Sequence, residues 1–162
     1  MEIKKSTLED LSEILRVYEC ARQYMRDHGN PTQWGGTYPP CETVCADIEN
    51  GNLYVCTENG VIHGVFAFIE GDDPTYAVIE NGAWPDNKPY NVMHRMASDG
   101  EIRGIGKAAL DFCKSHGKNV RADTHKDNIT MQNLLSKNGF VSCGTIYVEN
   151  GSERIAYQYT NE

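Results

Sequence analysis

The chain has 162 residues, 40% of them hydrophobic, with a formal net charge of −8 and a pI near 5.1. One domain over residues 1–162 fits this size, and the acidic balance argues against binding to nucleic acid or to an anionic membrane, which need basic surfaces. The sequence shows no long apolar run and no signal-peptide pattern, so we expect a cytoplasmic protein.

Hydrophobic periodicity, turn residues and helix-start signals together predict the order of the elements. In chain order they are a strand at 3–5, a helix from about 8 to 27, a loop at 32–40, a helix at 42–50, strands at 53–57 and 61–70, a short strand at 75–80, a strand at 90–98, a helix at 107–116, a strand at 119–124, a helix opened by Asn128, and strands at 140–148 and 153–159. A doubly wound nucleotide-binding fold needs strands and helices that alternate from the start. Two consecutive helices near the N-terminus therefore exclude it.

Three local patterns support parts of this order. Ser6 and Glu9 have the spacing of a capping box at the start of the first helix. Glu58-Asn-Gly60 is a strong hairpin signal between two strands. The second helix should bury one apolar face, made of Val44, Cys45 and Ile48.

Six cysteines are scattered singly across the predicted helices and strands. Disulfides are rare in a chain without a secretion signal. Cys41 and Cys45 are spaced four apart but have no second ligand pair, so the sequence predicts no metal site. We expect the cysteines to be small buried hydrophobic residues.

The most informative stretch is the glycine-rich turn Arg103-Gly-Ile-Gly-Lys-Ala108, which lies between a predicted strand and a predicted helix. Such a turn presents unpaired backbone N–H groups and the positive end of a helix, and both attract a phosphate or pyrophosphate. The alternative is a tight turn whose glycines only solve a backbone problem.

Two motifs in the second half of the chain resemble a known family. The spacing Arg-x-x-Gly-x-Ala from Arg103 to Ala108 is similar to the acyl-CoA signature of the GNAT superfamily of N-acyltransferases, Gln/Arg-x-x-Gly-x-Gly/Ala. The run from Asn128 to Phe140, in which an Asn opens a helix that closes with Lys-x-Gly-Phe, resembles the next part of the same fold. The first half resembles it only in element order. The resemblance implies an α/β fold, the GNAT fold, with a mixed central β-sheet, helices on both faces and splayed central strands.

The resemblance also implies a cofactor, acetyl-CoA, and a set of residues that bind it. These are Met96, Ala97, Ser98, Arg103, Gly104, Ile105, Gly106, Lys107, Ala108 and Asn128. The strand backbone at 96–98 would pair with the pantetheine amides like one more strand, and the turn would donate N–H groups to the pyrophosphate. Glycine at 104 and 106 would let the backbone approach the phosphate oxygens. Lys107 either adds a positive charge or is only solvated, and Asn128 is a helix N-cap, a pantetheine contact or both.

Acyl transfer from a thioester to an amine needs a base more than an acid. Deprotonating an ammonium with a pKa of about 10.4 costs about 4 to 5 kcal/mol at neutral pH. Releasing a thiolate, whose thiol has a pKa of about 8.5, costs only about 2 kcal/mol. His94 lies on the central strand, where similar acetyltransferases often place a glutamate, and an imidazole is a reasonable base at pH 7. Strand alternation should turn Val92, His94 and Met96 to one side. His94 could equally pack within the sheet, and His125 is the second candidate.

The family often places a tyrosine, which protonates the departing thiolate, where this sequence has Leu135. A thiolate can leave unassisted at modest cost, so we expect Leu135→Tyr to do little harm to turnover. The missing acid leaves room for a non-catalytic CoA-binding or sensor module of the same fold.

We therefore expect an acetyl-CoA-dependent N-acetyltransferase that acts by direct transfer on the primary amine of a small molecule or peptide. Trp34, Tyr38 and Trp84 either wall the acceptor pocket or are core aromatics. The expected partners are this amine and no nucleic acid or membrane, and the sequence leaves a homodimer open.

Overall fold

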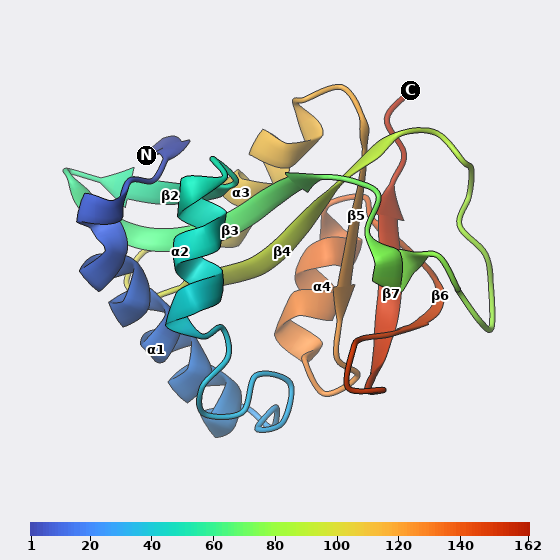
Figure 1. The fold of residues 1–162 in the computed structure, drawn as a ribbon, viewed down its shortest axis with the longest axis horizontal. Coiled ribbons are helices and arrows are strands. Elements are labelled where there is room, and N and C mark those ends of the chain that lie inside the picture. The colour runs from blue at the N-terminus through green and yellow to red at the C-terminus, as the bar shows by residue number, and fades with distance from the viewer.

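Seven strands form one mixed sheet in the order β1-β2-β3-β4-β5-β7-β6 in the computed structural model, which describes all 162 residues (Figure 1). The strands are β1 (Glu2–Lys5), β2 (Leu53–Glu58), β3 (Val61–Glu70), β4 (Tyr90–Ser98), β5 (Asn119–Thr124), β6 (Val141–Tyr147) and β7 (Glu153–Tyr159). Every neighbouring pair is antiparallel except β4 and β5, which run parallel. The mixed α/β sheet that the sequence predicts is confirmed.

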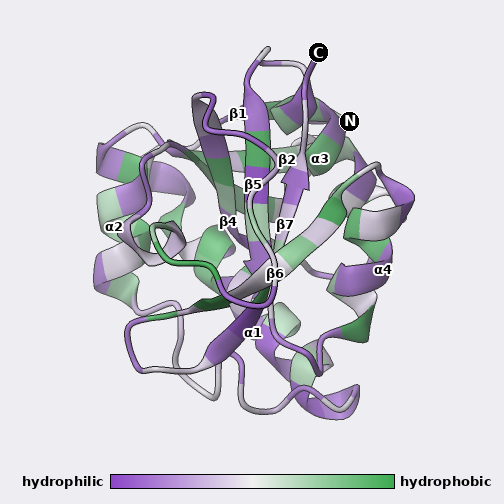
Figure 2. Cartoon of the chain, turned by 90° about the vertical axis from the view of Figure 1, so that its right-hand side faces the viewer, coloured by the Kyte–Doolittle hydropathy of each residue, from purple (hydrophilic) through white to green (hydrophobic).

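Four helices cover the two faces of this sheet. They are α1 (Leu11–Asp27), α2 (Cys41–Glu49), α3 (Ile105–Lys114) and α4 (Ile129–Lys137). Helices α1 and α2 contribute to one core cluster, and α3 and α4 contribute to another on the opposite face. Hydrophilic and hydrophobic segments alternate along the helices, as expected for helices with one face on the sheet (Figure 2). No helix is long and apolar enough to cross a membrane.

The predicted hairpin between β2 and β3 is present. Asn59 and Gly60 both have positive φ angles, 51° and 79°, which a two-residue turn of the favoured hand requires. Because this turn fixes the register of β2 on β3, the apolar residues of both strands alternate between the two core clusters.

The two parallel strands separate after three residue pairs. Tyr90, Asn91 and Val92 of β4 pair with residues 119–121 of β5, and beyond Val92 the strand pairs only with β3. Strand β5 continues along β7 as far as Thr124. Figure 1 shows β4 and β5 diverging, with α4 visible between them. The facing edges of the two strands therefore carry backbone groups that no neighbouring strand uses.

A bulge interrupts β4 within this diverging half. The register on β3 jumps from Ala67↔His94 to Val65↔Ala97, and Arg95 has a positive φ of 51°. Tyr18 stabilises the bulge because its hydroxyl donates to the Arg95 carbonyl at 2.9 Å. An extra residue in a strand reverses the alternation of its side chains.

The bulge makes one sequence-based expectation wrong. Val92 packs in a cluster on the α1 and α2 side of the sheet, and His94 turns its ring toward Tyr76 of that cluster. Met96, which lies beyond the bulge, packs against the cluster under α3 and α4. His94 and Met96 therefore lie on opposite faces of the sheet, not on the same side.

Two predictions near the start of the chain differ from the structure. Ser6 does not open a capping box; its hydroxyl instead donates to the Leu53 carbonyl at 2.9 Å, and the Thr7 amide donates to Asp10 Oδ2 at 2.9 Å one residue later. In α2 the buried residues are Val44, Asp47 and Ile48, and Cys45 is only partly buried. Asp47 is buried because it accepts two hydrogen bonds from the Arg95 guanidinium, each 2.8 Å long.

The sequence left a short strand or a sheet-edge contact open for residues 75–80, and the structure has no strand there. Residues Pro74–Tyr76 form a short 3₁₀-helix, since Pro74 favours a helix start and Asp73 Oδ1 accepts the Thr75 amide at 2.8 Å. Only Glu80 touches the sheet edge, through a bridge to Thr145.

The cysteines follow the prediction only in part. All six are free thiols, and Cys56 and Cys113 are fully buried in the sheet and in α3. Cys41 is exposed, and the other three are partly buried. Cys41 is the first residue of α2 and lies on the solvent side of this short helix, so its side chain does not reach the hydrophobic core.

Candidate active site

The turn between β4 and α3 offers a row of unused backbone donors. The first helical bond of α3 runs from the Ala108 amide to the Gly104 carbonyl, 3.0 Å long. The amides of residues 103–107 donate to no acceptor in the protein. These N–H groups lie at the positive end of the helix dipole. The turn therefore offers both hydrogen-bond donors and a positive electrostatic potential to a pyrophosphate.

Glycine is needed at the two positions of the turn for different structural reasons. Gly104 has a φ of 87°, a conformation that favours glycine, and a Cβ there would meet nothing within 4 Å. A Cβ on Gly106 would lie 2.5 Å from Leu134 Cδ2 of α4. Gly106 therefore lets α3 pack closely on α4. This packing role could not be predicted from the sequence.

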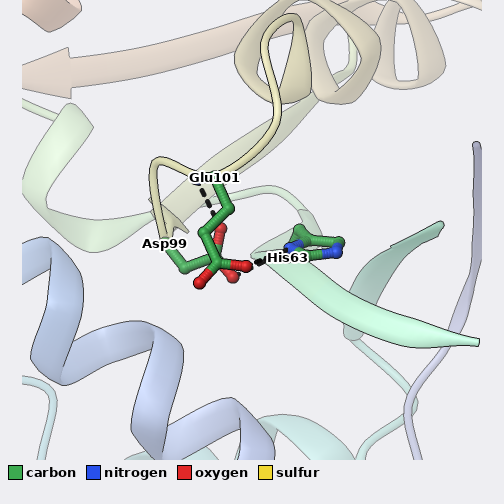
Figure 3. Close-up of side chains that lie close together, drawn as sticks. All are labelled: His63, Asp99 and Glu101. Atoms are coloured by element: carbon green, nitrogen blue, oxygen red, sulfur yellow. Dashed lines mark hydrogen bonds and ion pairs between the residues drawn. The ribbon is translucent and has the colours of Figure 1, made fainter.

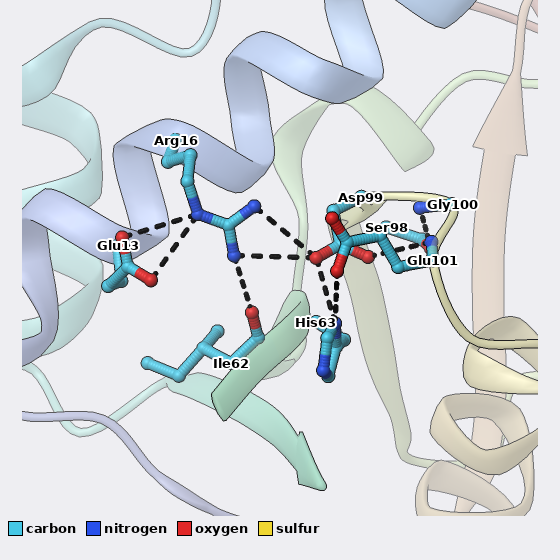
Figure 4. A network of polar contacts seen from close by, with 8 residues as sticks. All are labelled: Glu13, Arg16, Ile62, His63, Ser98, Asp99, Gly100 and Glu101. Atoms are coloured by element: carbon cyan, nitrogen blue, oxygen red, sulfur yellow. Dashed lines mark hydrogen bonds and ion pairs between the residues drawn. The ribbon is translucent and has the colours of Figure 1, made fainter. Parts of the chain in front are cut away.

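A network of polar contacts fixes the loop that leads into this turn (Figure 4). Asp99 Oδ2 lies 2.9 Å from His63 Nδ1 and 3.3 Å from the guanidinium of Arg16 in α1. The same guanidinium donates to the Ile62 carbonyl at 2.7 Å. The Asp99 side chain is almost fully buried, so these contacts hold the end of β4 against α1 and β3.

The same network contains a group of potential metal ligands. The ligand atoms of His63, Asp99 and Glu101 lie within 4.8 Å of one another (Figure 3). The Arg16 guanidinium already neutralises Asp99, and a second cation at this place would be repelled by it. The cluster is therefore best described as an anchor of the loop.

The predicted pantetheine residues lie along the diverging half of β4. Ala97 is buried against the α1 and α2 side, and Ser98 Oγ accepts the Gly100 amide at 3.1 Å. Met96 is partly exposed on the other face. Residues 96–98 pair with β3 only, so their second backbone edge faces the gap toward β5.

Asn128 is the N-cap of α4, as one of its two interpretations predicts. Its Oδ1 accepts the Met131 amide at 3.0 Å. Its Nδ2 donates to Gln33 Oε1 at 3.1 Å, which ties the start of α4 to the loop between α1 and α2. A contact of Asn128 with pantetheine stays a prediction.

Leu135 is fully buried in the cluster under α3 and α4. The structure therefore revises the expectation that a tyrosine is harmless at this position, because the larger ring and its hydroxyl would enter a filled core. The chain offers no side chain at this place that could protonate a thiolate.

We expect Leu135→Tyr to lower the free energy of unfolding by about 1 to 3 kcal/mol. Urea unfolding measures this loss, and Leu135→Met, which conserves volume, is the matched control and should lose less than about 1.5 kcal/mol. A tyrosine variant that is as stable as the wild type and turns over faster would contradict this expectation.

His94 is held by a carboxylate. Its Nε2 lies 2.8 Å from Asp73 Oδ2, and Thr75 donates to the other carboxylate oxygen. Burial alone would raise the pKa of Asp73, but the hydrogen bonds from His94 and Thr75 outweigh it and lower the pKa to about 2. An ionised carboxylate only accepts, so Nε2 carries the hydrogen and Nδ1 keeps the free lone pair of a base.

His125 is held in a different way. Its Nδ1 accepts the Asp127 amide at 3.0 Å, so that lone pair is already used. Burial and the nearby Arg154 charge lower the pKa of His125. No hydrogen bond links His125 with His94. The Asp127 carboxylate lies 3.5 Å from His125 Nδ1, longer than the 2.8 Å contact between Asp73 and His94 Nε2.

The three predicted pocket aromatics fall into two groups. Trp34 packs edge-on against Tyr18 at 5.7 Å and lies 6.1 Å from Tyr38, next to α1. Trp84 packs on the other side of the site, where the Arg121 guanidinium lies 3.9 Å from its ring centre. Trp84 lines a hollow of about 810 Å³ at the start of β4 and β5. The three rings therefore do not form one wall.

Sequence reasoning missed the side chains that surround His94. Tyr76 lies 6.2 Å from the His94 ring, and its hydroxyl donates to Asp123 Oδ2 at 2.6 Å. Asp73 and Tyr76 come from the segment after β3, and Asp123 comes from β5. The Asp-Pro-Thr pattern at 73–75 signals a helix start, but nothing in it signals contact with a histidine 21 residues away.

Comparisons with known proteins extend this geometry. No protein-family model matches the sequence, and no curated protein matches it. Among solved structures, an acetyltransferase of the GNAT family from Streptococcus agalactiae 2603 has 32% identity and a TM-score of 0.88, over 99% of this chain and 95% of that one.

Two more distant structures share the fold. The Salmonella typhimurium protein yncA, solved with its cofactor acetyl-CoA, has 14% identity and a TM-score of 0.66, over 99% of this chain and 94% of that one. A ribosomal-protein-alanine N-acetyltransferase from Brucella melitensis has 18% identity and a TM-score of 0.67, over 99% of each chain. The likeness therefore covers both the diverging strands and the turn that follows them.

Proposed function

Because the chain belongs to the GNAT family of acetyltransferases, we propose that it moves an acetyl group from acetyl-CoA to a primary amine of a small molecule or peptide by direct transfer. The observation that carries this proposal is the row of free amides at 103–107 beside the open edges of β4 and β5. An open strand edge can pair with the amides of the pantetheine arm of CoA, and the free amides of the turn beside it can bind the pyrophosphate of CoA.

The residues present fit such a cofactor. The free edge of 96–98 suits the pantetheine amides, and the turn from Arg103 to Ala108 suits the pyrophosphate. Lys107 is 66% exposed and bonded to Asp111, so it contributes charge near the turn without being fixed on it. When bound, acetyl-CoA supplies the thioester carbonyl and a thiolate leaving group.

His94 is the base of this mechanism. The ring lies two residues beyond the last β4–β5 pair, where the strands separate, on the α1 and α2 side. Its Nδ1 takes one proton from the substrate ammonium, and the neutral amine can then attack. Asp73 holds the ring by Nε2–H and stabilises the imidazolium that forms, since a charged pair strengthens the hydrogen bond.

The second proton on nitrogen leaves after the new C–N bond has formed. It can pass to the departing sulfur, so the products are an amide and a free thiol and the charges balance. The buried Leu135 supplies no proton, and the low cost of a thiolate leaving group makes an acid unnecessary.

The position of Leu135 also favours a second candidate, a CoA-binding sensor of the same fold without turnover. Release of free thiol separates the two. A panel of amines, amino acids, aminoglycosides and peptides should contain at least one acceptor that releases CoA steadily from acetyl-CoA. Tight CoA binding without turnover on the whole panel would establish the sensor.

A cytoplasmic location is part of this proposal. Cys41 Sγ and Cys45 Sγ lie 3.9 Å apart without a bond, and all six thiols are free. Free thiols in contact are typical of a reducing compartment.

A further inference from the structure

Arg154 of β7 is a buried cation with no carboxylate in salt-bridge contact. Burial lowers the pKa of Arg154, and the Asp123 carboxylate, which does not touch it, offsets this only in part. The residue is 8% exposed, and no carboxylate oxygen lies within 4.0 Å of its guanidinium. It donates to neutral oxygens only, those of Ser152, Glu153 and Gln33. Burying a charge without an opposite charge is costly, so such a cation in a folded protein calls for an explanation.

Arg121 is the other buried arginine without a carboxylate contact, and its charge is stabilised by aromatic rings and a hydrogen bond. Its guanidinium lies between the rings of Trp84 and Tyr90, 3.9 Å and 4.0 Å from their centres. It also donates to Gln158 Oε1 at 2.9 Å. Arg154 has no aromatic ring on either face, so the explanation that suits Arg121 does not apply to it.

The space beside Arg154 is open and lined mainly by polar side chains. A hollow of about 310 Å³ is lined by His125, Lys126 and Arg154, together with Thr145, Glu153 and Ile155. The cationic groups of the lining are Arg154 and Lys126, and its one acid is Glu153, in the exposed first position of β7. The Asp127 carboxylate lies next to the lining, 3.5 Å from His125 Nδ1. A small anion would find there a buried guanidinium with an unused Nε–H and a lysine.

This hollow adjoins the proposed acceptor side of the sheet. Arg154 contacts the carbonyl of Gln33, in the loop that also carries Trp34 and Tyr38. Arg154 is two residues before Ala156 in β7, so both point to the face whose cluster contains Tyr76, and the Tyr76 ring lies next to His94. Arg154 and the proposed base therefore lie on the same face of the sheet.

The geometry points to an acceptor amine that also carries a carboxylate, with Arg154 as the residue that binds this carboxylate. The inference rests on the proposed function, since it names the substrate class of the same site. A planar guanidinium binds a carboxylate through two parallel hydrogen bonds, which fixes the orientation of the amine as well. Substrate binding would supply the direct carboxylate contact that Arg154 lacks in the folded protein.

The test compares amino acids with their carboxamides, which differ only in this charge. In the wild type, kcat/KM should favour the acid by about 30-fold or more, mostly through KM. Arg154→Met should reduce this ratio to near one, and Arg154→Lys should keep part of it. CoA affinity and thermal stability should not change, and Arg26→Met, which removes an exposed arginine of α1, should leave the ratio intact.

A binding arm makes the inference independent of turnover. With CoA present, N-acetyl amino acids should bind to the wild type more tightly than their carboxamides in calorimetric titration, and Arg154→Met should abolish the difference. If no amine is acetylated but this difference is found, the proposed function fails and the carboxylate site stands. Equal use and equal binding of acids and carboxamides, a preference that survives in folded Arg154→Met, or a loss of CoA affinity in that variant would each overturn the inference.

Discussion

Replacing His94 by alanine should lower kcat/KM for the amine acceptor by about 10² to 10⁴. The affinity for CoA should stay at the wild-type value, because the imidazole points to the α1 and α2 side and Met96 to the other. Steady-state kinetics and calorimetric titration with CoA measure the two quantities on the same protein.

The pH profile tests whether His94 acts as the base. In the wild type, kcat/KM should fall on the acid side of the profile, because a general base must be unprotonated to act, and this limb should vanish in His94→Ala or move toward the pKa of the amine. Asp73 stays ionised far below neutral pH, since its pKa is lowered to about 2. The stability that this shift contributes is present above the ordinary value of 3.8 and is lost only as the pH falls through about 2, so it does not distort the profile.

Two variants control the assignment. Asp73→Asn should reduce kcat/KM by less than His94→Ala does, since the base remains but is no longer held by a charge. His125→Ala should keep the acidic limb, because its Nδ1 is occupied by the Asp127 amide. If the limb survives in His94→Ala and disappears in His125→Ala, the base is His125.

Lys107→Glu should weaken CoA binding by about tenfold to a hundredfold, because it reverses a charge beside the unused amides of the turn. The fold should tolerate the change. A glutamate in the first turn of α3 gains from the helix dipole about as much as it loses beside Asp111 one turn later.

The control for this charge reversal is Lys4→Glu on β1, which changes the net charge by the same amount on an exposed strand. It should keep wild-type CoA affinity in the same titration. Equal affinities for Lys107→Glu and the wild type would place the pyrophosphate somewhere else. Gly106→Asp is a poorer probe, because its side chain would also collide with Leu134 and disturb α4.

Most of the element order could be predicted because its signals are local. The Asn59-Gly60 turn, the helix opened by Asn128 and the strand at 119–124 each depend on residues a few positions apart, and all three lie where the sequence places them. The glycine-rich turn at 103–108 was found for the same reason.

The parts that sequence reasoning missed depend on distant residues. The bulge at Arg95 is held by a hydroxyl from Tyr18 and a carboxylate from Asp47, both far away in the chain. No local pattern reveals such an insertion, so the side to which Met96 points could not be predicted. The partner of His94 was missed likewise, since Asp73 reaches it through a turn whose shape depends on tertiary packing.

The short pairing between β4 and β5 has a mechanical consequence. Only three residue pairs join the half of the sheet that contains β1–β4 to the half that contains β5–β7, so packing and side-chain contacts carry most of the connection between the halves. The contacts of Tyr76 with Asp123, of Gln33 with Asn128 and Arg154, and of Glu80 with Thr145 all cross this boundary, whereas His94 and Asp73 lie on the same half. A change in the angle between the halves would therefore strain these crossing contacts while the histidine and its carboxylate move together as one unit.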